Sequence, residues 1–279
     1  MSDDDFVSLV TDVRERIRIQ ALEELVQIKE LESDIDPDFL RTIDYALALN
    51  NTPIALVLGV SDSSQDRVII SGGGISKVEG GEKLVEEGYQ PYFRLDLRLI
   101  GKLLGFRCRD SFLQVWVSGS DWGQGKIGVC TTDNINEVDI AEACRLPSFD
   151  FCDTPNLEYC TMVPIGRGCL TTSILEYFEM ESIGLEKTKD LIDEIDETYN
   201  GVADGLLMSL DIVGGTESDC FSELLLESTR QGGVWLPLAK LSGPNDDAAS
   251  GIVDQYAVFY KPNGDTVDEF KVLYHRFRY

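Results

Sequence analysis

The sequence predicts an α+β fold with antiparallel sheets, arranged as two similar halves of repeated helix–strand–strand units behind an extra N-terminal helix. Three observations support this class. Apolar residues near the N-terminus recur at helical spacing. Further along the chain, pairs of β-rich runs flank polar or glycine-rich turns, which is typical of antiparallel hairpins. The order of one helix and two strands recurs four times, in units that begin near residues 38, 97, 184 and 234.

The first helix is expected over residues 5–31, whose apolar side chains keep a helical period. A second helix is predicted after Pro37 and ends near the segment NNTP at 50–53. The run IALVLGVSDSSQDRVIIS at 54–71 holds two β-rich stretches around a polar turn, so it predicts a hairpin.

The next two units follow the same order. RLIGKLLGF at 98–106 predicts a short helix, and the segment 111–132 predicts two strands joined by a tight glycine-rich turn. In the third unit, the apolar stripe of 184–199 predicts a helix, and 205–228 predicts strand, turn and strand.

The last unit is less regular. Its first segment, VWLPLAKL at 234–241, predicts a short helix or an extended approach, interrupted by Pro237. The chain then ends in a predicted hairpin over 255–279, with Asn263 and Gly264 as a two-residue turn.

A proline-containing segment without a clear period separates the second and third units and predicts a connector. The expected organisation has four parts: an N-terminal helical extension at 1–36, a first α+β domain at 37–143, the connector at 144–168, and a second α+β domain at 169–279.

The chain is strongly acidic: 24 basic and 50 acidic side chains give a net charge of -26. Such a surface repels phosphate backbones and anionic membranes at long range, and it favours basic partners, metal cations or high salt. Adaptation to high salt fits poorly with seven cysteines and many isoleucines. No signal peptide or bilayer-spanning run is visible, so we expect a soluble intracellular protein of the cytoplasm or nucleus, with no membrane partner. A viral or phage genome is one possible origin of such a chain.

No metal, cofactor or catalytic residue is expected, so the chain is predicted not to be an enzyme. The cysteines form no C-x-x-C pair and His275 is the only histidine, which favours reduced thiols over a zinc site. The glycine-rich run 71–83 matches neither of the two phosphate-binding motifs, G-x-x-x-x-G-K-[ST] and G-x-G-x-x-G. Three alternatives stay open: a metal cluster in 144–169, a nucleophilic Cys169 beside an anion site at Arg167, and a Mg²⁺ site built from carboxylates.

Positive charge gathers in one segment, RLDLRLIGKLLGFRCR at 94–109, where five basic residues accompany one acid. On the predicted helix, Arg98 and Lys102 lie on one side and apolar side chains on the other. The pattern predicts an apolar back and a cationic front that contacts phosphates. The alternative is that the basic side chains pair with the surplus carboxylates of neighbouring elements.

The repeated helix–strand–strand units, the connector between two halves and the acidic composition together resemble the DNA sliding clamps, the ring-shaped processivity factors of polymerases. The order of elements carries the resemblance over residues 38–279. Residue types carry it over FRLDLRLIGKLLGFRCRDSFLQVWVSGSDWGQGKIGVCTT at 93–132. In that family a strand leads into a short helix that contains leucine and lysine, and then into a hairpin.

The resemblance implies that short helices line a central hole with basic side chains, while acidic sheets face outwards. Duplex DNA would be held without base reading. The side chains that would face it are Arg98, Lys102, Arg107 and Arg109. Edge strands of neighbouring chains would pair to close a ring, so the resemblance implies a homo-oligomer.

The resemblance also implies an apolar pocket beside the connector that accepts short peptides of replication proteins. The residues that would contact such a peptide are Leu146, Phe149, Phe151 and Tyr159. Three features depart from the family pattern: the N-terminal helix is an addition, the helix at 184–199 is acidic, and Pro237 occupies a helix position.

The sequence therefore predicts a non-enzymatic, sliding-clamp-like ring subunit that holds a replication protein on duplex DNA. The alternative is an acidic, non-enzymatic assembly or interaction protein with a basic protein partner, either a viral or phage structural component or an inhibitor that mimics nucleic acid.

Overall fold

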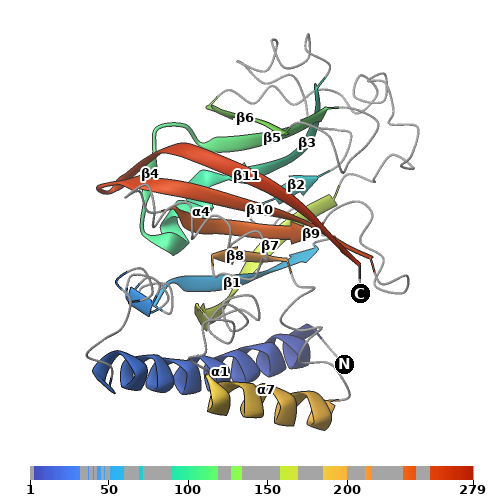
Figure 1. The fold of residues 1–279 in the computed structure, drawn as a ribbon. Coiled ribbons are helices and arrows are strands. Elements are labelled where there is room, and N and C mark those ends of the chain that lie inside the picture. The colour runs from blue at the N-terminus through green and yellow to red at the C-terminus, as the bar shows by residue number, and fades with distance from the viewer. Residues whose placement is uncertain are drawn as a thin grey trace.

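The computed structural model describes most of the secondary structure of the chain (Figure 1). The described residues are 3–31, 37, 40, 43, 44, 47, 51–59, 69–71, 89–118, 127–133, 158–168, 185–199, 211–214, 235–242 and 252–278. The helices with defined bounds are α1 (Asp3–Leu31), α4 (Leu97–Leu104) and α7 (Glu186–Tyr199). The expected mixed α+β class is confirmed.

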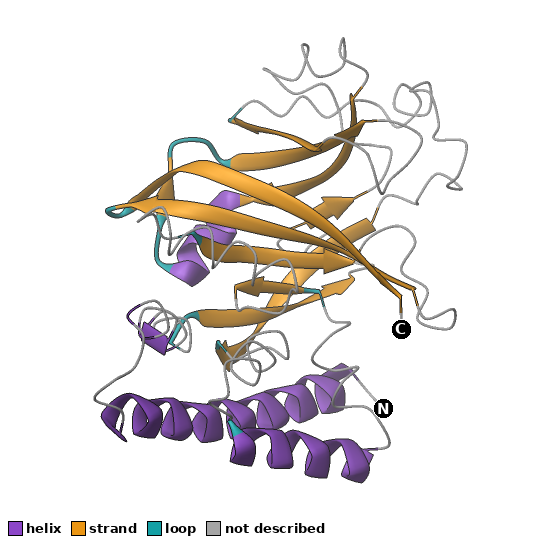
Figure 2. Cartoon of the chain, viewed as in Figure 1, coloured by secondary structure: helices purple, strands orange, loops and turns teal. Residues whose placement is uncertain are grey.

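The described strands form one 11-stranded sheet, in the order β4-β11-β10-β9-β8-β1-β7-β2-β3-β5-β6. Their bounds are β1 Pro53–Gly59, β2 Ile69–Ser71, β3 Tyr89–Asp96, β4 Arg107–Cys108, β5 Phe112–Ser118, β6 Ile127–Thr132, β7 Glu158–Arg167, β8 Ile212–Gly214, β9 Leu236–Ser242, β10 Ile252–Asn263 and β11 Thr266–Arg278. Neighbouring strands are antiparallel except β4 and β11, which are parallel. The sheet curls, so that β11 contacts β6 near the opposite end of the order (Figures 1 and 2).

Two predicted local motifs are confirmed. The segment 89–132 forms strand β3, helix α4 and the antiparallel pair β5–β6, as the second unit requires. The closing hairpin forms from β10 and β11 around Asn263 and Gly264, and Gly264 adopts the positive φ of 64° that such a turn needs.

The predicted hairpin at 54–71 is wrong. Strands β1 and β2 exist, but β7 lies between them and pairs with both. Residues 158–167, which fall within the predicted connector, are therefore part of the central sheet. A β-rich run shows that a strand forms, whereas its partner is set by long-range packing that a local pattern does not record.

The segment with Pro237 takes the extended one of its two expected forms and makes strand β9. Pro237 pairs with Phe259 in β10, at a shift in register between Val258 and Phe259. Because proline cannot donate a ladder hydrogen bond, an irregular position is where a strand tolerates it. The second strand of the third predicted unit, in the region 219–228, lies outside the described residues. The two similar halves stay a prediction, since the described strands share one continuous sheet.

Alternation along the strands divides the core between the two faces of the sheet. In β1, Ala55 and Val57 face the cluster that contains α4, whereas Ile54 and Leu56 face α1. The first cluster is the larger and takes in α4 with β1, β3, β5 and the C-terminal strands. Helix α4 thus lies on the inner face of the curl and α1 on the opposite face of β1, β7 and β8 (Figure 1).

Helices α1 and α7 pack side by side (Figure 1) and are joined by an unusual cap. Residue Leu185, directly before α7, has no side-chain oxygen to accept the first free backbone N–H groups. Glu24 of α1 supplies the acceptor: its carboxylate takes hydrogen bonds from the backbone N–H groups of Lys187 and Thr188, both at 2.8 Å, and from the Thr188 hydroxyl at 2.6 Å. Glu24 is buried, so these bonds fix α7 against α1.

We expect Glu24→Ala to lower the free energy of unfolding by about 2–3 kcal/mol, because it leaves two helix N–H groups and a buried hydroxyl without their acceptor. Denaturant unfolding measures the change. Glu23→Ala, one residue away and exposed, is the matched control and should change stability by less than about 0.5 kcal/mol. Equal effects of the two changes would contradict the cap.

Gly214 in β8 should be intolerant of any side chain. It has a φ of 73°, and a Cβ atom there would lie 2.2 Å from the Pro53 carbonyl oxygen. Gly214→Ala is expected to destabilise the fold by about 2 kcal/mol or more. Gly59→Ala, where a Cβ would meet nothing within 4 Å, is the control and should melt close to the unmodified protein.

Candidate nucleic-acid interface

Helix α4 is defined at both ends by its own sequence. Asp96 is the N-cap: its Oδ1 accepts hydrogen bonds from the backbone N–H groups of Arg98 at 2.9 Å and Leu99 at 3.2 Å. Gly105 ends the helix in the left-handed conformation, with a φ of 80°. Both ends are satisfied locally, so an eight-residue helix is held in one orientation.

The predicted two-sided character of α4 is confirmed. Leu97, Ile100 and Gly101 are buried against the sheet. Arg98 and Lys102, one helical turn apart, are exposed. Arg107 and Arg109 follow directly after the helix and are also exposed. We call the four side chains of Arg98, Lys102, Arg107 and Arg109 the cationic patch.

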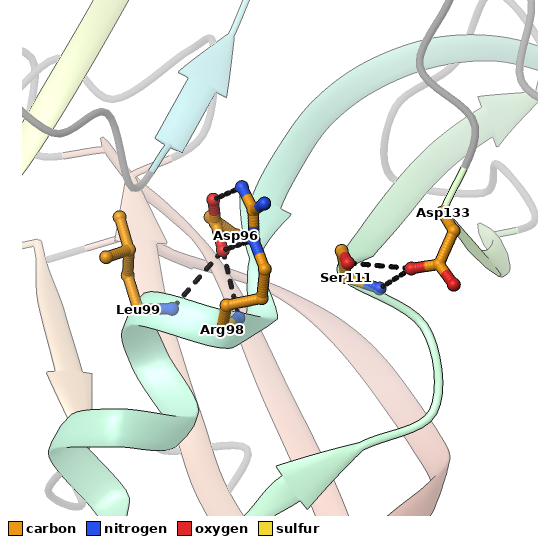
Figure 3. A network of polar contacts seen from close by, with 5 residues as sticks. All are labelled: Asp96, Arg98, Leu99, Ser111 and Asp133. Carbon is orange, nitrogen blue, oxygen red and sulfur yellow. Dashed lines mark hydrogen bonds and ion pairs between the residues drawn. The ribbon is translucent and has the colours of Figure 1, made fainter.

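Arg98 is held by the acid that caps the helix (Figure 3). Its Nε donates to Asp96 Oδ1 at 3.1 Å and its Nη2 to Asp96 Oδ2 at 2.5 Å. These hydrogen bonds, which the Asp96 carboxylate accepts, raise the pKa of the guanidinium. The guanidinium carbon also lies 4.7 Å from the centre of the Phe112 ring, within cation–π range. The side chain is 62% exposed, whereas that of Asp96 is 7% exposed, so Arg98 still presents donors to solvent.

The alternative that neighbouring acids neutralise the basic residues is therefore correct for Arg98. Lys102 differs: it makes no ion pair with any residue that the structure describes. Arg107 is placed by strand β4, where its backbone N–H donates to the Asp265 carbonyl at 2.9 Å. Lys102, like Arg107 and Arg109, is thus an exposed cation without an ion-pair partner among the described residues.

Arg94, the first basic residue of the segment 94–109, is not part of the exposed face of α4. Residues 89–96 form a strand, so alternate side chains point to opposite faces. Phe93 and Leu95 enter the core shared with α4, and Arg94 lies on the other face, 4% exposed. Its Nε donates to Gln114 Oε1 at 3.2 Å. The basic segment is consequently split between strand and helix.

A second polar contact lies beside Arg98 (Figure 3). Asp133, directly after β6, accepts the backbone N–H of Ser111 at 2.7 Å and its hydroxyl at 2.6 Å, both at Oδ1. These hydrogen bonds lower the pKa of Asp133, with smaller contributions from the charges of Arg98 and Arg109. Asp110 accepts a short hydrogen bond from the Thr131 hydroxyl nearby.

Carboxylates therefore offset part of the charge of the cationic patch. Asp96 bonds Arg98, and the charges of Arg98 and Arg109 both act on Asp133. The sequence signal for Asp96 was available, because aspartate directly before an apolar periodic run is a preferred N-cap. The contact of Asp133 with Ser111 spans 22 residues and has no local signal.

The other predicted site residues are mostly not placed. Leu146, Phe149 and Phe151, of the expected peptide pocket, lie outside the described residues, as does Cys169. Tyr159 belongs to β7, where it pairs with Ile70 of β2. Among the described positions, no group of His, Cys, Asp or Glu is arranged to hold a metal ion.

Cys108 of β4 is half-buried, and burial raises the pKa of its thiol to about 12. The raised pKa disfavours the thiolate, which is the reactive form of cysteine.

Comparisons of the chain with protein-family models, with curated proteins and with solved structures found no match. Within the described part of the chain, no helix combines the length and apolarity needed to cross a bilayer. The resemblance to sliding clamps stays a prediction from the sequence.

Asp96→Ala should lower the free energy of unfolding by about 1–2 kcal/mol, because it removes the N-cap of α4 and the partner of Arg98 together. Asp96→Asn keeps an oxygen that can cap the helix while removing the negative charge, so it should cost less than half as much. Chemical denaturation of both variants gives the comparison. An equally large loss in Asp96→Asn would assign the stability to the ion pair instead of the cap.

Proposed function

We propose that the chain is a non-enzymatic, sliding-clamp-like subunit that contacts the backbone of duplex DNA through the cationic patch while it holds a replication protein there. The observation that carries the proposal is the two-sided helix α4. Its back is seated in the core and its front exposes Arg98 and Lys102, in a chain of net charge -26. A cationic front preserved in so acidic a chain favours a local polyanionic ligand.

The mixture of basic and acidic side chains in the patch favours a protein that stays on DNA by encircling it, rather than one that binds DNA tightly. Lysine and arginine contacts to phosphates release counterions, and affinity then falls steeply with salt. With Asp96, Asp110 and Asp133 close by, a single patch should bind DNA weakly. A closed ring of several copies would retain DNA despite weak contacts, which is why the proposal includes a homo-oligomer.

Strand β6 supports ring closure. It is the last strand in the sheet order and pairs on one side with β5, which is its only partner among the described strands. Strand β11 contacts β6 across the curl, but among the described strands only β5 pairs with it, so the proposal places the added strand of a second chain at this edge. Two similar halves, and a peptide pocket near 144–168 formed with Leu146, Phe149, Phe151 and Tyr159, belong to the same proposal.

A second candidate is an acidic interaction protein that binds a basic partner. The observation in its favour is α7, which packs on α1 through Ile192 and Ile195 and exposes a row of carboxylates. The exposed acids are Glu186, Asp190, Asp193, Glu194 and Glu197. Such a protein would compete with DNA for the partner and would not bind DNA itself.

Lys102→Glu tests the first function. We expect it to weaken binding of a short duplex about tenfold at low salt and to reduce the slope of log affinity against log salt by about one unit, because one phosphate contact is lost. Lys187→Glu on α7, exposed and on a helix that packs against α1, is the matched control and should leave both quantities nearly unchanged. Fluorescence anisotropy measures the affinities.

Closed circular and linear DNA of the same sequence separate ring retention from simple binding. Co-sedimentation should retain the protein on the circle and lose it from the free ends of the linear form. Absence of DNA binding, together with competition against DNA for a basic protein, would replace the clamp by the second candidate.

A further inference from the structure

We propose that the Asp133 carboxylate occupies a position that a DNA phosphate takes in the complex, so that Asp133 is a displaceable competitor built into the interface. This inference rests on the proposed function and adds a regulatory element to the same surface. Figure 3 shows the residues involved: Asp133 accepts hydrogen bonds from Ser111, and Arg98 lies on the same side of the molecule.

The geometry at Ser111 is that of an anion site. The backbone N–H and the hydroxyl of one residue converge on a single oxygen, Asp133 Oδ1, at 2.7 Å and 2.6 Å. Backbone N–H groups and serine hydroxyls are among the usual donors to phosphate oxygens in protein–DNA complexes. A phosphate oxygen at the place of Oδ1 would accept the same two hydrogen bonds.

The surrounding charge also suits a phosphate. Arg98 and Arg109 both act on Asp133 through their positive charge, yet neither forms a direct ion pair with it. Arg98 keeps its hydrogen bonds to Asp96, so its position does not depend on Asp133. An incoming phosphodiester would therefore meet Arg98, already oriented by Asp96, together with the positive charge of Arg109, next to the donors of Ser111.

Asp133 is free to leave this position. It is exposed and lies just beyond the last residue of β6, outside both hydrophobic clusters. A carboxylate and a phosphodiester each carry one negative charge, so the phosphate would meet the Ser111 donors with the same charge that Asp133 presents there, while the exposed carboxylate moves aside into solvent. Binding of DNA at this point would be an exchange of anions rather than the filling of an empty site.

The test measures binding of a short fluorescent duplex by four chains: the unmodified protein, Asp133→Ala, Ser111→Ala, and the double variant. The matched control is Asp268→Ala, which removes an exposed carboxylate near Cys108 in the same region. We expect Asp133→Ala to raise affinity about fivefold to tenfold and Asp268→Ala about twofold, at about 50 mM salt. Melting temperatures confirm that each variant is folded.

Ser111→Ala makes the test specific. In the unmodified background it should change affinity little, because the hydroxyl has an acceptor both before binding, in Asp133, and after binding, in the phosphate. In the Asp133→Ala background it should remove most of the gain, because the phosphate then uses that hydroxyl. Asp133→Asn, which keeps an acceptor oxygen without the charge, should give an intermediate gain. Inorganic phosphate should raise the melting temperature of Asp133→Ala more than that of the unmodified protein, which separates free phosphate from the DNA backbone.

Equal effects of Asp133→Ala and Asp268→Ala would overturn the inference and leave only a general effect of charge. Weaker binding by folded Asp133→Ala would also overturn it, because Asp133 would then support the interface. If the Lys102 variant changes DNA affinity while the Asp133 variant does not, the proposed function stands and this inference fails. If no folded variant binds DNA, both fail.

Discussion

The seating of α4 in the curl of the sheet is the constraint on which the rest of the molecule depends. Its apolar side packs in one hydrophobic cluster with β1, β3 and β5 and with the C-terminal strands β9, β10 and β11. Leu97 and Ile100 are fully buried in this cluster. Asp96 and Gly105 fix its ends. The direction in which Arg98 and Lys102 point therefore follows from burial of the opposite side, and does not require any contact of their own. A surface helix without such a back would have no preferred orientation.

The sequence predicts local structure well where one segment contains all the information. The unit from β3 to β6 and the hairpin at Asn263 and Gly264 form from neighbours in the chain, so periodicity and turn residues suffice. The pairing of β1 with β7 joins distant segments, and here the prediction of a hairpin failed. Arg94 lies in β3, before the predicted helix, and its burial follows from the pairing of β3 with β5 rather than from any pattern in the basic segment.

The candidate site divides in the same way. Spacing alone places Arg98 and Lys102 on one side of α4, because they are one helical turn apart. Two acids reduce the positive charge of the cationic patch, and they differ in how far they lie from it in the sequence. Asp96 carries a local capping signal, whereas Asp133 reaches Ser111 from another strand of the sheet. Net charge therefore misleads as a guide to one surface: what matters is which carboxylates the fold brings within a few ångströms of each cation.

The parallel pairing of β4 with β11 has a consequence for how the chain is made. Arg107 lies beside Thr266, and Glu24 of α1 caps a helix 163 residues further on. During synthesis the early strands emerge long before these partners, so their exposed edges wait for the last hairpin to arrive. Closing such distant contacts carries a loop entropy that is recovered only once both segments are present. Nascent protein in which β10 and β11 have not yet emerged would expose apolar strand edges, to which chaperones bind.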